Sequence, residues 1–289
     1  MLSLLTLVRG RRAQLANLLK GVAAQKVAPD EVVIARMDAD PIDLGGYEGP
    51  PVRIVDVEGA EDSLPLAKAR NDAAASATGD LLVFLDIDCI PSPSLVASYR
   101  QALGREDGCF MGEVRYLAIV PPAGEPLDMA KLDRLSSRHV AKSAPPTANY
   151  VIEPDHGELW GLSFALTHAA FDRAGGFDER FDGYGGEETD FAMSLKRADI
   201  PLYRLANACA YHQYHPIHIP PLQHFDSILS NAERFREKHG RWCMDYWLGQ
   251  FAEKGLIEWS TATDRIVRLR QPTADEVARS CAPDGTLYS

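Results

Sequence analysis

The sequence predicts an α/β fold with a mostly parallel central sheet flanked by helices, followed by a small helical C-terminal extension. Apolar, strand-like runs alternate with helix-like patterns through the first half of the chain. One run, Leu81–Leu85, is apolar on both faces, as a central parallel strand must be when helices cover both sides of a sheet. The chain has 289 residues, 46% of them hydrophobic, which is enough to bury one large core.

The first half has the order β-α-β-β-α-β. The predicted strands are residues 2–8, 31–37, 52–57 and 81–85. Apolar residues recur at helical spacing after the first strand (Leu15, Leu18, Leu19 and Val22). An alanine-rich helix is predicted from about Leu66 to Ala77, and Thr78-Gly79 ends it, as glycine just past a helix commonly does.

The second half is less regular. Residues 108–150 are mixed and contain two proline pairs, so we assign no order of elements there. The pattern resumes with a strand at residues 162–166 and a short helix at residues 169–174, which Gly175-Gly176 ends. From Ile217 onward we expect a peripheral helical extension that begins after a break at Pro220-Pro221.

The composition argues against some classes of partner and environment. The formal net charge of −11 gives no reason to expect binding to DNA or RNA, whose phosphates attract basic surfaces. The five cysteines are scattered without a C-x-x-C pair, which indicates neither a zinc ribbon nor a disulfide framework and favours a reducing, cytoplasmic setting.

No apolar run approaches the roughly 18 residues that a membrane span needs. The chain begins with an apolar run followed by arginines, the reverse of the order in a signal peptide. If the substrate is lipid-linked, we therefore expect contact with the membrane surface only.

Charged side chains directly follow three of the predicted strands. In open parallel sheets, ligands bind beyond the carboxyl ends of the strands. The plainer alternative is that polar residues merely mark the strand ends, but three charged strand ends at one edge favour a binding site. The residues concerned are Arg9, Arg11, Asp38, Asp40, Asp86 and Asp88.

Asp86 and Asp88 lie two apart after a buried strand, so extended backbone directs both side chains to one face. Two adjacent carboxylates repel each other unless a cation neutralises them. Mg²⁺ and Mn²⁺ prefer oxygen ligands and usually share them with substrate phosphates. The pair therefore predicts a divalent cation that bridges a diphosphate.

An acidic segment, Gly185-Gly186-Glu187-Glu188-Thr189-Asp190, opens a second predicted helix. The paired glycines permit close approach of backbone, and acids at a helix N-terminus are stabilised by the helix dipole. That dipole interaction is the plainer explanation of the acids, and a site for acid-base chemistry is the alternative.

Histidines cluster beyond the last predicted strand, at His212, His215, His218 and His224. A neutral imidazole is a suitable ligand for Mn²⁺. A lone histidine is more often structural, but a cluster favours at least one metal ligand.

These motifs together resemble those of a known enzyme family. Residues 79–91 resemble the nucleotide-sugar site of family 2 glycosyltransferases with the GT-A fold, and residues 67–71 resemble the A-R-N segment that precedes it. Residues 175–179 and 185–190 resemble the acidic motif on the acceptor side of those enzymes. Residues 9–11 and 160–163, with the Gly-Gly-Glu stretch, are locally similar to the β-1,4-galactosyltransferase type.

The resemblance implies roles on the donor side. Asp38 would hold the base, Asp86 would lie near the ribose and Asp88 would ligate the metal, with His212 and then His215 as further ligands. Residues implied to contact the nucleotide, its phosphates or the sugar are Thr6, Arg9, Arg11, Arg70, Trp160 and Gly161.

On the acceptor side, the resemblance implies that Glu188 is the general base, where the family usually has Asp. Asp190 is the reserve base, and Glu187 is expected to orient an acceptor hydroxyl. Trp160 and Tyr184 flank the acidic motif, either as core residues or as platforms on which a sugar stacks.

The expected function is that of a metal-dependent, inverting glycosyltransferase. It would use Mn²⁺ or Mg²⁺ and a nucleotide-sugar donor, with a UDP-sugar favoured, and a glycan, lipid-linked or small-molecule acceptor. Residues 1–216 would form the catalytic domain, with a nucleotide-sugar half to about residue 107 and an acceptor half from 108, and residues 217–289 the extension. A nucleotidyltransferase that acts on a sugar phosphate and an inactive nucleotide-sugar-binding module remain as alternatives.

Overall fold

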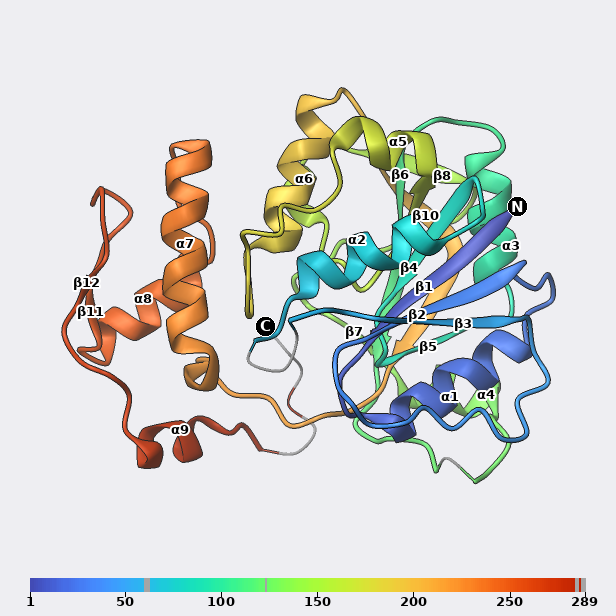
Figure 1. Cartoon of the computed structure of the whole chain (residues 1–289), viewed down its shortest axis with the longest axis horizontal. Coiled ribbons are helices and arrows are strands. Elements are labelled where there is room, and N and C mark those ends of the chain that lie inside the picture. The colour runs from blue at the N-terminus through green and yellow to red at the C-terminus, as the bar shows by residue number, and fades with distance from the viewer. Residues whose placement is uncertain (60–62, 123, 284–285, 287–289) are drawn as a thin grey trace.

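The computed structural model describes residues 1–59, 63–122, 124–283 and 286. One large sheet lies at the centre, and helices cover both of its faces (Figure 1). The strands of this sheet are β1 (Leu2–Val8), β2 (Glu31–Arg36), β3 (Val52–Asp56), β4 (Leu81–Leu85), β5 (Cys89–Pro91), β6 (Cys109–Tyr116), β7 (Ser137–Arg138), β8 (Tyr150–Glu153), β9 (Ser163–Thr167) and β10 (Leu202–His212).

The helices of the same part of the chain are α1 (Arg12–Ala23), α2 (Leu66–Ser76), α3 (Leu95–Leu103), α4 (Met129–Leu135), α5 (His168–Ala174) and α6 (Glu187–Arg197). The first half thus has the predicted order β-α-β-β-α-β. The strands run β3-β2-β1-β4-β9-β6-β10-β5 across the sheet, with β7 beside β6 and β8 beside β10.

The first four strands across the sheet, from β3 to β4, are parallel throughout. Their carboxyl ends therefore meet at one edge, where ligands of open α/β sheets bind. β9 then joins β4 and β6 antiparallel, and β10 runs parallel to β6. The α/β fold class is confirmed.

Two apolar layers hold this part together, one on each face of the sheet. On one face Leu5, Val33 and Phe84 pack with α2, α5 and α6. On the other face Leu4 and Val83 pack with α1 and α3. The alternation follows from the two-residue repeat of a strand, and it explains why Leu81–Leu85 is apolar on both faces.

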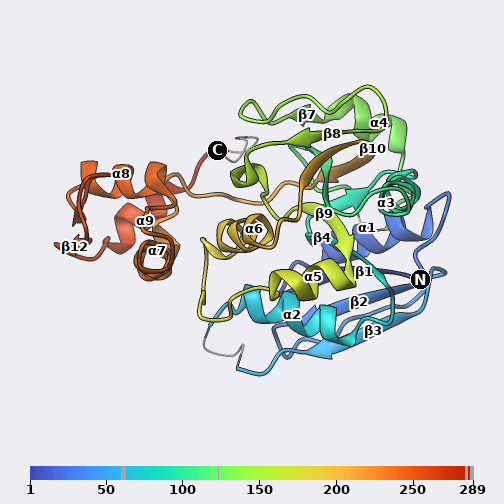
Figure 2. The same cartoon turned by 90° about the horizontal axis from the view of Figure 1, so that it is seen from above.

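The last part of the chain lies to one side of the sheet (Figures 1 and 2). It contains α7 (Phe225–His239), α8 (Asp245–Glu253), α9 (Ala274–Ser280) and the short antiparallel pair β11 (Ile257–Glu258) and β12 (Val267–Arg268). Its own core includes Phe225, Leu248 and Phe251. Tyr184, the residue before Gly185, packs against that core and so joins the extension to the acidic segment.

Among the described residues, no helix is long and apolar enough to cross a membrane.

Candidate active site

The loop after β1 turns sharply and faces the end of β2. Gly10 and Arg11 both have left-handed backbone, with φ of 62° and 50°. Asp38, which follows β2, accepts hydrogen bonds from the backbone N–H of Gly10 and from the guanidinium of Arg12. Burial acts to raise the pKa of the Asp38 carboxyl, but the hydrogen bonds from Gly10 and Arg12 and the charge of Arg12 outweigh it, so the pKa is lowered. Arg12, which the sequence analysis did not single out, is thus the partner of the carboxylate expected to hold the base.

Two other predicted donor-side residues lie near this loop. Arg9 donates to the carbonyl of Ser63. Thr6 is buried in β1, and among the described residues nothing forms a hydrogen bond with its hydroxyl. The loop after β1 and the end of β2 therefore form one charged edge, and the buried hydroxyl of Thr6 lies in the strand that leads to it.

Asp86 and Asp88 are placed by the junction of β4 with β5. The N–H of Asp86 donates to the carbonyl of Leu162 at 2.9 Å, and the side chain of Asp86 accepts from the N–H of Ile87 at 2.8 Å. The carbonyl of Asp88 accepts from the N–H of Gln213 at 2.7 Å. The aspartate pair is therefore anchored to the end of β10, where the histidines lie.

Asp88, His212 and His215 form a cluster. One ligand atom from each of these three residues lies within 4.8 Å of the other two. The side chain of Asp88 is fully buried, and Arg11 donates to its Oδ2. No described residue forms a hydrogen bond with its Oδ1.

Burial and the charge of Asp86 raise the pKa of Asp88 to about 7, against the effect of Arg11. Burial lowers the pKa of His212 to about 4, so its imidazole is neutral at pH 7 and keeps a free lone pair. A divalent cation fits this donor set, because it would satisfy the orphaned Oδ1 and offset the cost of burying the carboxylate. The cluster contains all three residues predicted as metal ligands.

The acidic pair at the start of α6 is held by a buried arginine. Arg70 donates to Glu187 at 3.0 Å and to Glu188 at 2.8 Å. Only 8% of the Arg70 side chain is exposed. Burial opposes its charge, but Glu188, Glu187 and Asp86 outweigh that effect and raise the pKa of Arg70. Arg70 is thus bound to the two glutamates and not, as expected, directed to phosphates.

Glu188 lies against Gly161. A Cβ at Gly161 would come within 2.2 Å of the Glu188 Oε1, and Gly161 has a φ of +66°. Burial raises the pKa of Glu188 to about 8, although Arg70 acts in the opposite direction. A carboxylate of this kind is a stronger base than an ordinary glutamate, which suits removal of a proton from a hydroxyl group.

A cavity of about 90 Å³ is lined by residues that neighbour the two clusters, although no residue of either cluster is part of its wall. Its lining includes Gly161, Trp160, His139 and Tyr116. The Tyr116 ring lies 4.9 Å from the ring of His212, and Lys142 Nζ lies 3.6 Å above the Trp160 ring. Trp160 therefore joins the cavity wall. His139, Tyr116 and Lys142 were not predicted as site residues, because they lie in residues 108–150, where the sequence has no clear order of elements.

Asp190 is in a different place from Glu188. It is fully buried and accepts from Lys238 and His239 of α7, each at 2.8 Å. Lys238 and His239 occupy its carboxylate, which is why it does not suit the role of reserve base that the sequence suggested.

The fold matches known proteins, and part of the sequence matches a family model. A family model described as the N-terminal domain of galactosyltransferase matches residues 147–218, which include the acidic segment and the histidines. The TarS protein of S. aureus (residues 1–349) aligns with a TM-score of 0.55 and 16% identity over 81% of this chain and 65% of TarS. The chain has the GT-A fold.

Other matches agree. GalNAc-T7, solved with UDP, GalNAc and Mn²⁺, aligns with a TM-score of 0.54 and 16% identity over 74% of this chain and 43% of its own. Validoxylamine A glucosyltransferase from Streptomyces hygroscopicus subsp. limoneus is 25% identical over 83% of this chain and 57% of its own length. Chondroitin synthase from Escherichia coli is 28% identical over 52% of this chain and 25% of its own. These similarities support an enzyme of the glycosyltransferase type, and the chain spans only part of both curated relatives.

Proposed function

We propose that the chain is a metal-dependent, inverting glycosyltransferase that moves a sugar from a nucleoside diphosphate, with UDP favoured, to an acceptor hydroxyl. The observation that carries the proposal is the cluster of Asp88, His212 and His215 around the orphaned Oδ1 of Asp88. It lies at the edge of the parallel strands, where the diphosphate of a donor is expected. TarS solved with UDP-GlcNAc and GalNAc-T7 solved with UDP and Mn²⁺ share the fold and favour these ligands.

In this proposal Glu188 is the general base. Its carboxylate takes the proton from the acceptor hydroxyl while that oxygen forms a bond to the anomeric carbon. The bond from the anomeric carbon to the diphosphate breaks, and the nucleoside diphosphate leaves with the electron pair. A bound Mn²⁺ or Mg²⁺ would stabilise the negative charge on the leaving group. Arg11, which contacts Asp88, would stabilise that charge as well.

We assign the cavity beside Trp160 to a sugar ring. Its wall includes the aromatic side chains of Trp160 and Tyr116. It also includes the polar side chains of Lys142 and Glu158, and Lys142 donates to Glu158 at 2.9 Å. Such a wall suits a sugar, which has both apolar faces and hydroxyl groups. The acceptor is a glycan or a small hydroxyl compound, and residues 1–216 contain the donor site and the proposed base.

Thermal shifts with nucleotides test the proposal. UDP, GDP, CMP and dTDP are compared with and without Mn²⁺, on the natural chain and on Asp88→Asn. A ligand at about 100 times its Kd adds about 2.7 kcal/mol to stability. We expect UDP to stabilise the chain only with Mn²⁺, and Asp88→Asn to lose that effect.

Asp264→Asn is the matched control, because Asp264 is 94% exposed and pairs only with Arg236 among the described contacts. It should respond to UDP as the natural chain does. Equal shifts for Asp88→Asn and the natural chain would overturn the assignment of the metal site. Release of pyrophosphate from a nucleoside triphosphate in the presence of a sugar phosphate would indicate a nucleotidyltransferase instead.

A further inference from the structure

The acidic loop, defined here as residues 178–190, is held from outside the sheet. Asn231 of α7 is almost fully buried, with 1% of its surface exposed. Its side-chain amide donates to the carbonyl of Asp182 at 2.9 Å and to that of Gly185 at 2.8 Å. Both donors of one amide group therefore fix the backbone that leads into Glu187 and Glu188.

The glycines of the loop allow this close contact. A Cβ at Gly183 would come within 2.3 Å of the Ser227 side chain, and one at Gly185 within 2.6 Å of the Met244 sulfur. Both glycines also have positive φ, of 79° and 91°. Ser227 Oγ accepts from the N–H of Tyr184 at 3.1 Å. The loop thus lies directly on the extension, with no room for side chains at these two positions.

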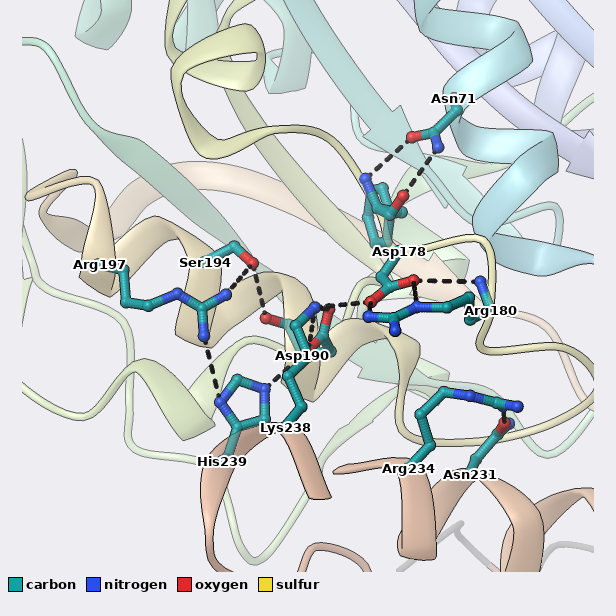
Figure 3. Close-up of polar contacts among 11 residues, drawn as sticks. Asn71, Asp178, Arg180, Asp190, Ser194, Arg197, Asn231, Arg234, Lys238 and His239 are labelled. Atoms are coloured by element: carbon teal, nitrogen blue, oxygen red, sulfur yellow. Dashed lines mark hydrogen bonds and ion pairs between the residues drawn. The ribbon is translucent and has the colours of Figure 1, made fainter. Parts of the chain in front are cut away.

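A second anchor follows the glutamates (Figure 3). Lys238 Nζ lies 2.7 Å from the Asp178 carboxylate and 2.8 Å from that of Asp190. His239 Nε2 lies 2.8 Å from Asp190. These contacts join the start of the loop, the first turn of α6 and the C-terminal end of α7.

The two anchors lie on either side of Glu187 and Glu188 along the chain. Asn231 holds the backbone just before them, and Lys238 with His239 holds Asp190 just after them. A buried carboxylate such as Asp190 is costly without the ammonium of Lys238 and its other hydrogen-bond donors, so the contacts with α7 stabilise the first turn of α6.

We propose that α7 is a positioning element for catalysis, in which Asn231, Lys238 and His239 set the place of the Glu188 carboxylate. None of the three is assigned a contact with substrate. The inference rests on the proposed function, because it assumes that Glu188 is the base. It gives the extension a part in turnover that is separate from donor binding.

Asn231→Asp tests the first anchor. Aspartate has nearly the same shape as asparagine but cannot donate to the two carbonyls, so the loop should shift. With UDP-glucose, UDP-galactose or UDP-GlcNAc and Mn²⁺, turnover is measured as UDP release to water. We expect kcat to fall about 10-fold to 100-fold, as displacement of a reacting group by about 1 Å can cause, with KM for the UDP-sugar changed less than about 2-fold.

Ser230→Ala is the matched control, since Ser230 is the exposed neighbour of Asn231 on α7. It should keep the natural kcat. Circular dichroism and UDP binding show whether Asn231→Asp is folded. A folded variant with natural kcat would overturn the proposal.

His239→Leu and His239→Gln test the second anchor and remain informative if Asn231→Asp does not fold. A glutamine amide can replace the Nε2 donor, whereas leucine cannot. We expect kcat to fall with leucine and to recover with glutamine. Equal loss in both variants would indicate packing alone and contradict the proposal.

Glu188→Gln distinguishes a failure of the proposed base from a failure of the positioning role of α7. If it abolishes UDP release while the anchor variants are unaffected, the base assignment holds and the positioning role fails. If Glu188→Gln itself retains natural turnover, the assignment of the base fails first.

Discussion

The donor edge, which is the set of charged residues after β1, β2 and β4, and the acidic loop are built in different ways. The donor edge consists of residues that directly follow strands, and its charges pair with one another, as Arg11 does with Asp88 and Arg12 with Asp38. The acidic loop has backbone at Gly185 and Gly186 with φ of 91° and 92°, and it is fixed by a helix that comes much later in the chain. The sheet topology alone places the first region, whereas tertiary docking places the second.

This difference separates binding from turnover. Changes at the donor edge should mainly weaken nucleotide and metal binding, whereas changes around the acidic loop should mainly lower kcat. The following changes test that separation, from the largest expected effect to the smallest.

Glu188→Gln removes the proposed base and keeps the shape of the side chain. We expect turnover to fall by about 10²-fold to 10⁴-fold, the usual contribution of a general base. UDP binding, measured by calorimetry, should stay natural. Glu233→Gln, at an exposed position of α7, is the control and should leave both unchanged. Loss of UDP binding in Glu188→Gln would contradict the separation.

Arg70→Met leaves two glutamates without their shared cation. Removing one partner of a buried ion pair costs about 3–5 kcal/mol, so the free energy of unfolding in urea should fall by about that amount. Arg36→Met breaks a pair whose Asp56 side chain is 70% exposed, and it should change the free energy of unfolding far less than Arg70→Met does, because solvent screens an exposed pair. Similar losses of unfolding free energy in both variants would contradict the expectation that the buried Arg70 ion pairs stabilise the fold more than an exposed pair does.

Gly161→Ala places a methyl group where the Glu188 carboxylate lies. The backbone of residue 161 also has positive φ, which costs an L-residue about 1–2 kcal/mol. We expect about a 10-fold fall in kcat with natural UDP affinity, because a moved base is less effective. Gly249→Ala meets nothing within 4 Å and is the control. An unchanged kcat in Gly161→Ala would contradict the claim that turnover depends on the position of the Glu188 carboxylate.

Acid should weaken the joint between the loop and α7. The hydrogen bond from Arg180, together with Lys238, holds the pKa of Asp178 well below its ordinary value of 3.8. A carboxyl with a lowered folded pKa stabilises the fold above its unfolded pKa and loses that contribution as pH falls through the folded pKa. The melting temperature of the natural chain should therefore approach that of Asp178→Asn as pH falls below about 4. A constant difference down to pH 2 would contradict this.

Much of the nucleotide half was predictable from the sequence, because its elements repeat locally. The runs at residues 2–8 and 81–85 are buried strands, and the expected order of elements is confirmed. The segment after residue 108 was not predictable. β6 is only partly buried along most of its length, and β7 is two residues long, so neither has a clear periodic pattern.

In the candidate site too, some residues were predictable from the sequence and the contacts between distant segments were not. Asp88, His212 and His215 were expected as metal ligands because the family resemblance implied it, and the structure brings them together. The partners of Arg70 and Asp190 were not foreseen. Arg70 pairs with Glu187 and Glu188, and Asp190 pairs with residues of α7, and no local spacing encodes contacts between such distant segments.

The Asn231 contact has a consequence for protein engineering. A chimera with a related enzyme that exchanges the chain at residue 216 would separate the acidic loop from the amide that holds its carbonyls. The segments that have to be exchanged together are residues 178–190 and α7, although β10 lies between them in the sequence. A library that varies α7 while leaving every donor-edge residue untouched would then tune the rate without altering nucleotide choice.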